Sequence, residues 1–183
     1  FRKYKRPLTE SNIRLAIKEH YRKNARLKTE VDVETSKFET MYKESATLYR
    51  IRVEEGPKTR LAGVNFLGNS YYPSSKLESF FDRDAFELAS IGYFDEEYFR
   101  HYIDLLRNRY IKNGFVQIKI QGPNYTFSED SERVNVDYNI FEGQRAYVRS
   151  ISMEGLPIEF EEEVLEILKN KKGSPFNPIT LID

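Results

Sequence analysis

The apolar positions between residues 61 and 92 change from a short apolar stretch to a helical spacing. Leu61 to Leu67 ends at Gly68-Asn69, a pair typical of turns, so a strand is predicted over these residues. Ser75 and Glu78 then stand at the spacing of a capping box, which marks the start of a helix. One face of this helix is apolar and comprises Leu77, Phe80, Phe81 and Leu88. The pattern therefore predicts a strand followed by a first helix.

The next part of the chain predicts a second helix and a hairpin. Phe94-Asp95 places an apolar residue before an N-cap, and apolar residues follow at three- and four-residue intervals as far as Asn113-Gly114, a helix stop. Val116 to Ile120 and Val134 to Ile140 then alternate with a period of two on either side of the polar loop Ser128 to Ser131. The order β-α-α-β-β predicts an α+β domain in which two helices cover one face of a three-stranded sheet.

The chain repeats part of this pattern at a distance of 87 residues. Each copy has an alternating apolar run, a Glu-Gly corner, and a second apolar run closed by glycine. The nine positions are Tyr49, Ile51, Val53, Glu55, Gly56, Leu61, Val64, Phe66 and Gly68, which recur as Val136, Tyr138, Ile140, Glu142, Gly143, Val148, Ile151, Met153 and Gly155. A repeat of this length is the size of a domain, so it predicts tandem modules.

The residues on both sides of the central unit repeat fragments of it. Before it, Leu8-Thr9 precedes an amphipathic helix, and two alternating runs follow, the second ending at Val53. After it, Val148 to Met153 matches the first strand, Phe160 to Leu168 marks a helix, and Phe176-Asn177 matches the start of helix two. We therefore expect a partial module over residues 1–59, a complete module over 60–147 and a second partial module over 148–183.

Composition and charge exclude several classes of protein. The 183 residues are 39% hydrophobic and 32% charged, which is typical of a folded chain rather than a disordered one. Because 29 basic and 29 acidic residues give a formal net charge of zero, no overall field favours nucleic acid or a membrane surface. The chain has no cysteine, and no apolar run approaches the ~20 residues that span a bilayer.

No pattern in the sequence indicates catalysis or a metal site. His20 and His101 each lie on a predicted helix without a second ligand at metal-binding spacing. The sequence contains no glycine-rich phosphate loop and no nucleophile elbow. We therefore expect no enzymatic activity, no catalytic residue, no cofactor and no metal.

Three short motifs in the central unit follow one another in the order seen in a known family. They are Val64-Asn65-Phe66-Leu67-Gly68-Asn69 on the first strand, Arg109-Tyr110-Ile111-Lys112-Asn113-Gly114-Phe115 at the end of helix two, and Ile140-Phe141-Glu142-Gly143 after the third strand. With these motifs, the segment from Leu61 to Tyr147 resembles a POTRA (polypeptide-transport-associated) domain of the Omp85 superfamily, most like an outer-membrane assembly protein of the BamA kind. The first segment departs from the family pattern, because Ala25-Arg26 stand where the family has glycine and an aromatic residue.

The resemblance implies both a fold and a function. The fold is a tandem array of β-α-α-β-β modules, each a three-stranded mixed sheet covered on one face by two helices. The function is a periplasmic scaffold at the outer membrane that binds unfolded outer-membrane polypeptides and accessory assembly subunits. The resemblance also implies a covalently linked C-terminal membrane β-barrel outside this segment. A TamA-like protein, a two-partner secretion transporter and an organellar import channel remain alternatives.

One strand of the predicted hairpin is the candidate site for client polypeptides. At the edge of a sheet it leaves N–H and C=O groups unpaired, and these can pair with an extended peptide. The alternation places Val116, Ile118 and Ile120 toward the helices and Gln117, Lys119 and Gln121 toward solvent. Lysine on an edge also prevents aggregation, so an adhesive and a merely protected edge both remain open. The candidate edge comprises Phe115, Val116, Gln117, Ile118, Lys119, Ile120 and Gln121.

The two Glu-Gly corners are candidate interdomain hinges. Glu55-Gly56 and Glu142-Gly143 both follow a predicted strand. A glycine that lets the chain turn after a strand accounts for the same pattern without a functional role, and this structural interpretation is the simpler one.

Nucleic-acid binding is the alternative from a different functional class. Ten lysines and arginines lie between Phe1 and Lys28, with aromatic residues among them. The zero net charge and the lack of an RNA-binding aromatic pattern oppose it, so no nucleic-acid partner is expected.

Overall fold

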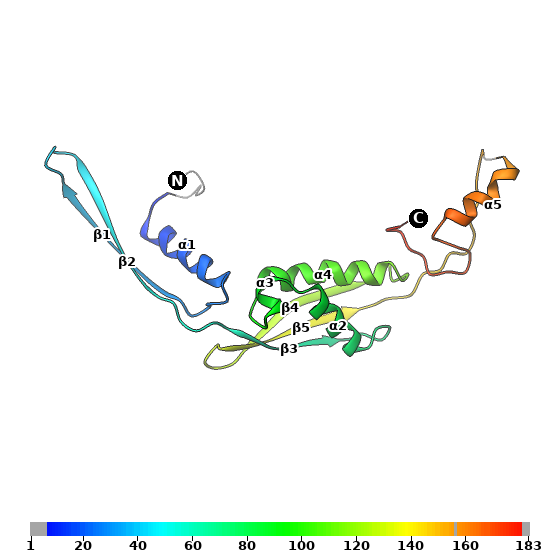
Figure 1. The fold of residues 1–183 in the computed structure, drawn as a ribbon, viewed down its shortest axis with the longest axis horizontal. Helices are drawn as coiled ribbons and strands as arrows, with labels where there is room; N and C mark the ends of the chain where they lie inside the picture. The colour runs from blue at the N-terminus through cyan, green and yellow to red at the C-terminus, as the bar shows by residue number, and fades with distance from the viewer. Residues whose placement is uncertain (1–6, 156, 181–183) are drawn as a thin grey trace. The chain divides into compact units, whose positions relative to one another are not determined.

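The computed structural model describes residues 7–155 and 157–180, which form an α+β fold (Figure 1). Contacts within the chain divide it into two compact units. One comprises the residues up to Gly63 with Phe86–Glu96 and Thr126–Asn135; the other comprises Val64–Ala85, Glu97–Tyr125 and the residues from Val136 onward.

The sheet of the central segment has three strands and mixed direction. β3 (Arg60–Leu67), β5 (Arg133–Phe141) and β4 (Lys119–Phe127) lie side by side in that order, so β5 is central. β3 and β5 are parallel, because contacts between them keep one sequence offset: the Arg60 N–H donates to the Glu132 carbonyl at 2.7 Å, and the Asn65 amide to Asp137 at 2.7 Å. β4 and β5 form an antiparallel hairpin, which confirms the predicted mixed sheet.

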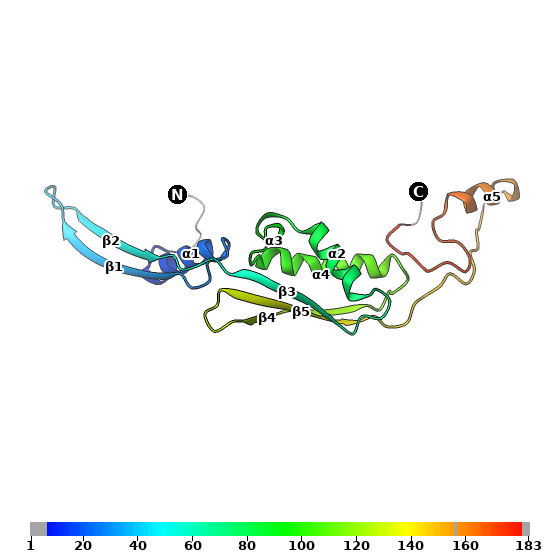
Figure 2. The same cartoon turned by 60° about the horizontal axis from the view of Figure 1, so that its bottom comes forward.

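Helices α2 (Ser74–Asp84) and α4 (Glu96–Ile111) bury the core of the second unit against the sheet (Figure 2). The ring of Tyr138 on β5 stacks on Phe66 of β3 with 5.6 Å between centroids. Its hydroxyl donates to the Phe99 carbonyl of α4 at 2.7 Å, and Tyr102 donates to the Leu77 carbonyl at 2.9 Å. Aromatic rings therefore fill this core, while their hydroxyls bond to helix carbonyls.

The first segment contains a helix and a hairpin. α1 (Glu10–Arg22) begins where the Thr9 hydroxyl accepts the Asn12 N–H at 3.2 Å, as the apolar residue and cap at Leu8-Thr9 predict. β1 (Glu30–Glu39) and β2 (Ser45–Glu54) form a two-stranded antiparallel sheet, in which Val31 and Val33 are buried.

The third segment differs from the expectation. The helix appears as α5 (Ile158–Ile167), but Val148 to Met153 forms no strand; an isolated bridge joins Tyr147 and Pro175. A strand requires a neighbour, and β3 finds its parallel neighbour 72 residues further along the chain. Val148 to Met153 has no such neighbour among the described residues, so the apolar alternation alone does not produce a strand.

Three further boundaries also differ from the sequence-based expectation. α2 begins at Ser74 with Pro73 as its N-cap and without a side-chain cap, so Ser75 and Glu78 form no capping box. Leu88 belongs to the short helix α3 (Glu87–Ser90), which the sequence pattern did not separate from the first helix.

The third difference concerns the candidate edge, since β4 begins at Lys119 and residues 115–118 form a turn before it. In this turn the Phe115 N–H donates to the Tyr110 carbonyl at 3.1 Å and the Ile118 N–H to the Phe115 carbonyl at 3.2 Å. The prediction therefore begins the alternation at Val116, whereas the strand begins at Lys119.

Candidate functional site

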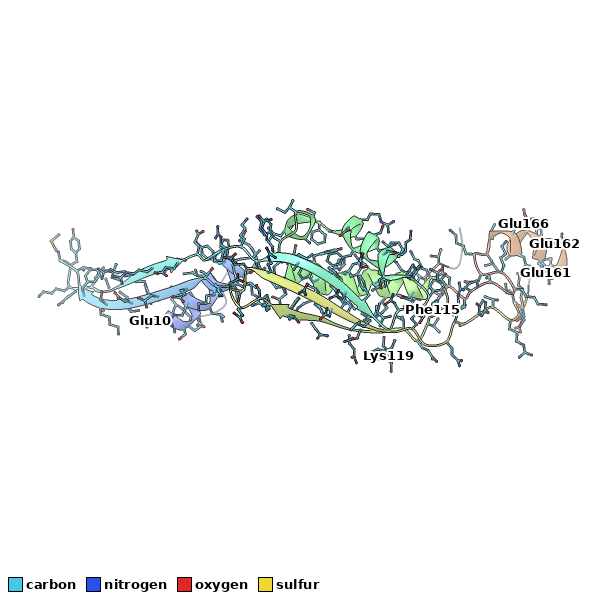
Figure 3. All side chains as sticks on the ribbon, turned by 90° about the horizontal axis from the view of Figure 1, so that it is seen from below. Glu10, Phe115, Lys119, Glu161, Glu162 and Glu166 are labelled. Atoms are coloured by element: carbon cyan, nitrogen blue, oxygen red, sulfur yellow. The ribbon has the colours of Figure 1, made fainter. Side chains whose placement is uncertain are left out.

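β4 lies at an edge of the three-stranded sheet, and the predicted site residues surround its first end. Phe115 and Ile118 are buried, whereas Val116 is 41% exposed and does not face the helices as predicted. Lys119 extends from the outer side of the strand, and Phe115 lies at the preceding turn (Figure 3). Gln117, Lys119 and Gln121 are exposed, as expected, and Ile120 is half-buried.

The edge of β4 is interrupted near its middle. Gly122 has a φ of +123°, and a Cβ at this position would approach the Asp137 carbonyl oxygen to 2.7 Å. The next residue, Pro123, has no N–H to donate. Gly122 and Pro123 together break the regular ladder, as bulges and prolines do on protected sheet edges. The uninterrupted part of the predicted site is therefore Lys119–Gln121.

The Glu142 side chain joins three parts of the second unit. Its Oε1 accepts the backbone N–H groups of Ser70 and Tyr71, at 2.8 and 2.9 Å, and the hydroxyl of Tyr110 at 2.9 Å. A carboxylate that accepts several donors holds them more strongly than a neutral acceptor does. Glu142 therefore connects the end of β5 to the loop after β3 and to the last turn of α4.

Glu55 occupies the equivalent corner of the first unit with fewer partners. Its Oε1 accepts the Tyr21 hydroxyl at 3.2 Å, and its Oε2 lies 3.2 Å from the guanidinium of Arg26. Tyr21 and Tyr110 both lie in the last turn of a helix, so the tyrosine–glutamate contact occurs in both corners.

The glycine of each corner adopts a left-handed conformation, with φ of +67° at Gly56 and +71° at Gly143. A Cβ on Gly56 would lie 3.0 Å from the Lys28 carbonyl oxygen, and one on Gly143 would lie 3.2 Å from the Gln117 side chain. Both the φ angle and the close approach favour glycine, which supports the structural interpretation of these residues.

A backbone connection that the sequence analysis missed occurs beside both corners. The Thr59 N–H donates to the Ala25 carbonyl at 2.8 Å, and the Ala146 N–H to the Gly114 carbonyl at 2.8 Å. Ala25 and Gly114 both follow a helix with positive φ, +61° and +92°. Thr59 and Ala146 are 87 residues apart and so occupy equivalent positions of the repeat. Because the contact uses only backbone atoms, the two side chains can differ, and the sequence pattern does not reveal the equivalence.

The same two residues are also acceptors. The Phe94 N–H donates to the Thr59 carbonyl and the Phe176 N–H to the Ala146 carbonyl, each at 2.9 Å. In the second copy, the Asn177 side chain accepts the N–H groups of Ile179 and Thr180 at 3.1 and 3.3 Å, as a helix cap does. Each connecting segment is therefore held from both sides by backbone hydrogen bonds.

Arg145 adds a side-chain contact to the second connection. Its Nε donates to the Asn113 carbonyl at 2.8 Å, and its guanidinium lies 4.7 Å from the centre of the Tyr71 ring. Lys58 stands at the equivalent position of the first connection, 5.2 Å from the ring centre of Tyr93. A cation over an aromatic face stabilises both connections.

The surroundings of Tyr110 in the second corner favour its neutral, protonated hydroxyl. Burial, followed by the hydrogen bond to Glu142 and its charge, raises the pKa of Tyr110 well above its usual value near 10. The pKa of Tyr21 is also raised, by desolvation first and then by the hydrogen bond to Glu55. Both hydroxyls therefore remain donors at neutral pH.

The described residues contain no cluster of three or more His, Asp or Glu side chains that can hold a metal ion. Among the helices that the structure describes, none is long and apolar enough to cross a membrane. The geometry of the described site residues consists of a strand edge and two clamped corners.

Comparison with protein families identifies the central segment. The family model of POTRA, described as the surface antigen variable number repeat, matches residues 59–143. Residues 59–143 form a POTRA domain. The match includes β3, α2, α3, α4, β4 and β5, so the POTRA domain has the predicted β-α-α-β-β order with α3 added.

Solved structures of POTRA segments match 81–91% of this chain at TM-scores of 0.48 or less, and the chain spans less than two thirds of the length of each. POTRA domains three to five of BamA from Haemophilus influenzae are 16% identical, with a TM-score of 0.48 over 91% of this chain and 63% of that one. The N-terminal domain of Omp85 from Thermosynechococcus elongatus is 16% identical, with a TM-score of 0.40 over 81% of this chain and 60% of that one. POTRA domains one to three of Omp85 from Anabaena are 18% identical, with a TM-score of 0.37 over 82% of this chain and 60% of that one.

Proposed function

We propose that this chain is a periplasmic scaffold segment of an outer-membrane protein assembly or transport factor, and that it works without catalysis. The observation that carries the proposal is the POTRA domain at residues 59–143, with a strand at the free edge of its sheet. Its clients are unfolded outer-membrane polypeptides, its other partners are accessory assembly subunits, and a membrane β-barrel belongs to the same protein.

The capture of clients relies on backbone pairing. An extended peptide that adds to the outer side of Lys119–Gln121 forms main-chain hydrogen bonds, which tolerate many client sequences. The exposed side chains of Lys119 and Gln121 are polar, so the edge is compatible with water when no client is bound. Phe115 and Ile118 anchor the start of this segment in the core.

The corners at Glu55-Gly56 and Glu142-Gly143 set the position of each following module. In this proposal they are hinges with limited articulation, because Thr59 and Ala146 are each held by two backbone hydrogen bonds. A hinge of this kind presents successive edges to a client without detaching one module from the next.

Backbone amide NMR of the isotope-labelled chain tests the proposed function. Unfolded β-strand peptides from outer-membrane proteins are titrated in, with a scrambled polar peptide as the control. Amide shifts concentrated at Lys119–Gln121, with the control silent, are the expected result. If the folded chain shows no response along any strand edge, the capture of unfolded clients is wrong and a docking scaffold for folded partners replaces it.

A further inference from the structure

Three basic side chains of the POTRA domain gather around one aromatic ring. The charged groups of Lys76, Arg83 and Arg109 lie 5.1, 5.1 and 4.3 Å from the centre of the Phe80 ring. Lys76 and Arg83 belong to α2 and Arg109 belongs to α4, the helices that cover one side of the sheet (Figure 2). These three residues, the basic cluster, form one patch on the helical side of the domain.

The basic cluster carries more positive charge than its neighbours neutralise. Asp84 is the acid within it, with Oδ2 at 2.5 Å from Arg109 and Oδ1 at 3.4 Å from Arg83. Within the part of the chain that the structure describes, Lys76 forms no ion pair. The other two acids of α2 lie on the opposite flank of the helix, since successive residues are about 100° apart. Three cations and one carboxylate therefore leave two positive charges in excess.

The charged groups of the basic cluster are both accessible and held in place. Lys76 and Arg83 are exposed, and 28% of the Arg109 side chain is exposed. An aromatic face attracts cations, so the buried ring of Phe80 restricts the positions of all three groups. A ligand thus meets charges that are already ordered, and its binding costs less conformational entropy.

The contacts of Asp84 indicate the chemistry of the ligand. Its carboxylate accepts one N–H from Arg109 and one from Arg83, and guanidinium groups pair with carboxylates through several N–H groups. Among the described residues, the other terminal N–H groups of these two arginines have no hydrogen-bond acceptor. Lys76 and Arg83 are seven residues apart, about 10 Å along α2, a distance that a chain with several carboxylates spans and one compact anion does not.

We propose that the basic cluster binds a segment of a partner protein that carries several aspartate or glutamate side chains. Although the formal net charge of the whole chain is zero, the local excess of positive charge attracts an acidic segment to this patch. The contact goes beyond the proposed function, because it uses side chains of α2 and α4, whereas client capture uses the backbone of β4. The two can therefore fail separately.

Amide NMR of the labelled chain tests the proposal with three titrants. They are a capped eight-residue peptide that alternates glutamate and serine, a lysine–serine peptide of the same length, and inorganic phosphate. We expect shifts in α2 and the last turn of α4 with the glutamate peptide alone. These shifts should disappear in about 1 M sodium chloride, where the Debye length is about 3 Å.

A pair of double variants tests the assignment to these residues. Lys76→Gln with Arg83→Gln removes two exposed charges of the basic cluster. Lys18→Gln with Lys23→Gln removes the same charge from exposed positions in the first segment and is the matched control. We expect about tenfold weaker binding of the glutamate peptide by the first variant, since each exposed ion pair contributes about threefold, and unchanged binding by the control.

Asp84→Asn supplies an arm with the opposite sign. It removes the carboxylate that competes for Arg83 and Arg109, so the glutamate peptide should bind about threefold more tightly. A cluster that only covers Phe80 gives no such gain.

Three results overturn the proposal. They are an equal response to the lysine peptide or to phosphate, an equal loss in the two double variants, and the absence of shifts in α2 and α4. None of them affects client capture, which is measured at β4 with different peptides. The spectra also report whether each variant retains its fold.

Discussion

The two Glu-Gly corners share a backbone design but differ in what their glutamates hold. Gly56 and Gly143 turn the chain with nearly equal φ angles, and a tyrosine from the preceding helix donates to the glutamate in each corner. Glu142 also accepts two backbone N–H groups from the loop after β3, whereas the contacts of Glu55 are with Tyr21 and Arg26.

This difference distinguishes the contacts that both copies of the repeat make from the contacts that depend on other parts of the fold. The turn and the tyrosine contact depend on residues within one hairpin and its helix, so both copies have them. The third connection of Glu142 requires the loop after β3, where Ser70 and Tyr71 lie 72 and 71 residues earlier in the same POTRA domain. The same motif is therefore a turn in the first unit and a structural clamp in the second.

Removal of the clamp has the largest expected effect. Glu142→Ala leaves the Ser70 and Tyr71 N–H groups and the Tyr110 hydroxyl without their acceptor. We expect the free energy of unfolding to fall by about 3 kcal/mol, because hydrogen bonds to a charged group are worth about 1.5–3 kcal/mol each and are not additive. Urea denaturation followed by circular dichroism measures the loss.

Glu55→Ala is the matched control for that prediction. Its carboxylate is about half exposed, so the pair with Arg26 contributes less than about 1 kcal/mol. Equal losses for the two variants contradict the distinction between clamp and turn.

The residue after each helix gives the second comparison. Gly114→Ala places a Cβ 2.6 Å from the Ala146 carbonyl oxygen, on a backbone with positive φ. We expect a loss of about 2 kcal/mol in the free energy of unfolding, from left-handed strain and the displaced contact. The reverse exchange, Ala25→Gly, should change it by less than about 1 kcal/mol, since Ala25 already adopts this conformation. A larger loss for Ala25→Gly than for Gly114→Ala contradicts the expectation.

The outcome at particular residues shows what the sequence could predict. The cap at Thr9 and the cap-type hydrogen bonds of Asn177 depend on neighbours a few residues away, and both appear in the structure, although residues 176–180 form no helix. Val148 to Met153 carries the same apolar pattern as β3 but lacks a neighbouring strand, so local pattern and structure disagree. A strand forms only beside a neighbouring strand, which can lie far along the chain, whereas its apolar alternation involves only adjacent residues.

The candidate site shows the same limit. Its position at a sheet edge follows from the order of elements, which the sequence predicts well. The turn at residues 115–118 depends on the carbonyl of Tyr110, and the break in the edge depends on the φ of Gly122. Neither is visible in a period-two alternation, which explains why Val116 was assigned to the wrong face.

Alkaline pH provides a third way to test the corners. The pKa of Tyr110 is higher in the folded chain than its unfolded value of about 10, so the folded state holds the phenolic proton more tightly. This stabilisation is fully present below pH ~10 and is lost as the pH rises toward the folded-state pKa. Above pH ~10, the free energy of unfolding of the parent protein falls as the pH rises. We expect this slope to be less steep in Tyr110→Phe by about 1.4 kcal/mol per pH unit, measured by urea denaturation at each pH. An identical slope in the variant and the parent protein contradicts this assignment.

The smallest expected effect is at neutral pH, where the two tyrosine–glutamate contacts are compared directly. Tyr110→Phe deletes the 2.9 Å bond to Glu142 from a fully buried side chain, and we expect a loss of about 1 kcal/mol in the free energy of unfolding. Tyr21→Phe deletes a longer bond of 3.2 Å at an exposed site, where water replaces the lost donor, so no measurable change is expected. The ring is retained in both variants, which isolates the hydroxyl. If Tyr21→Phe lowers the free energy of unfolding as much as Tyr110→Phe does, the tyrosine–glutamate contact is equally strong in both corners. The two corners then differ only in the contacts of Glu142 with the loop after β3.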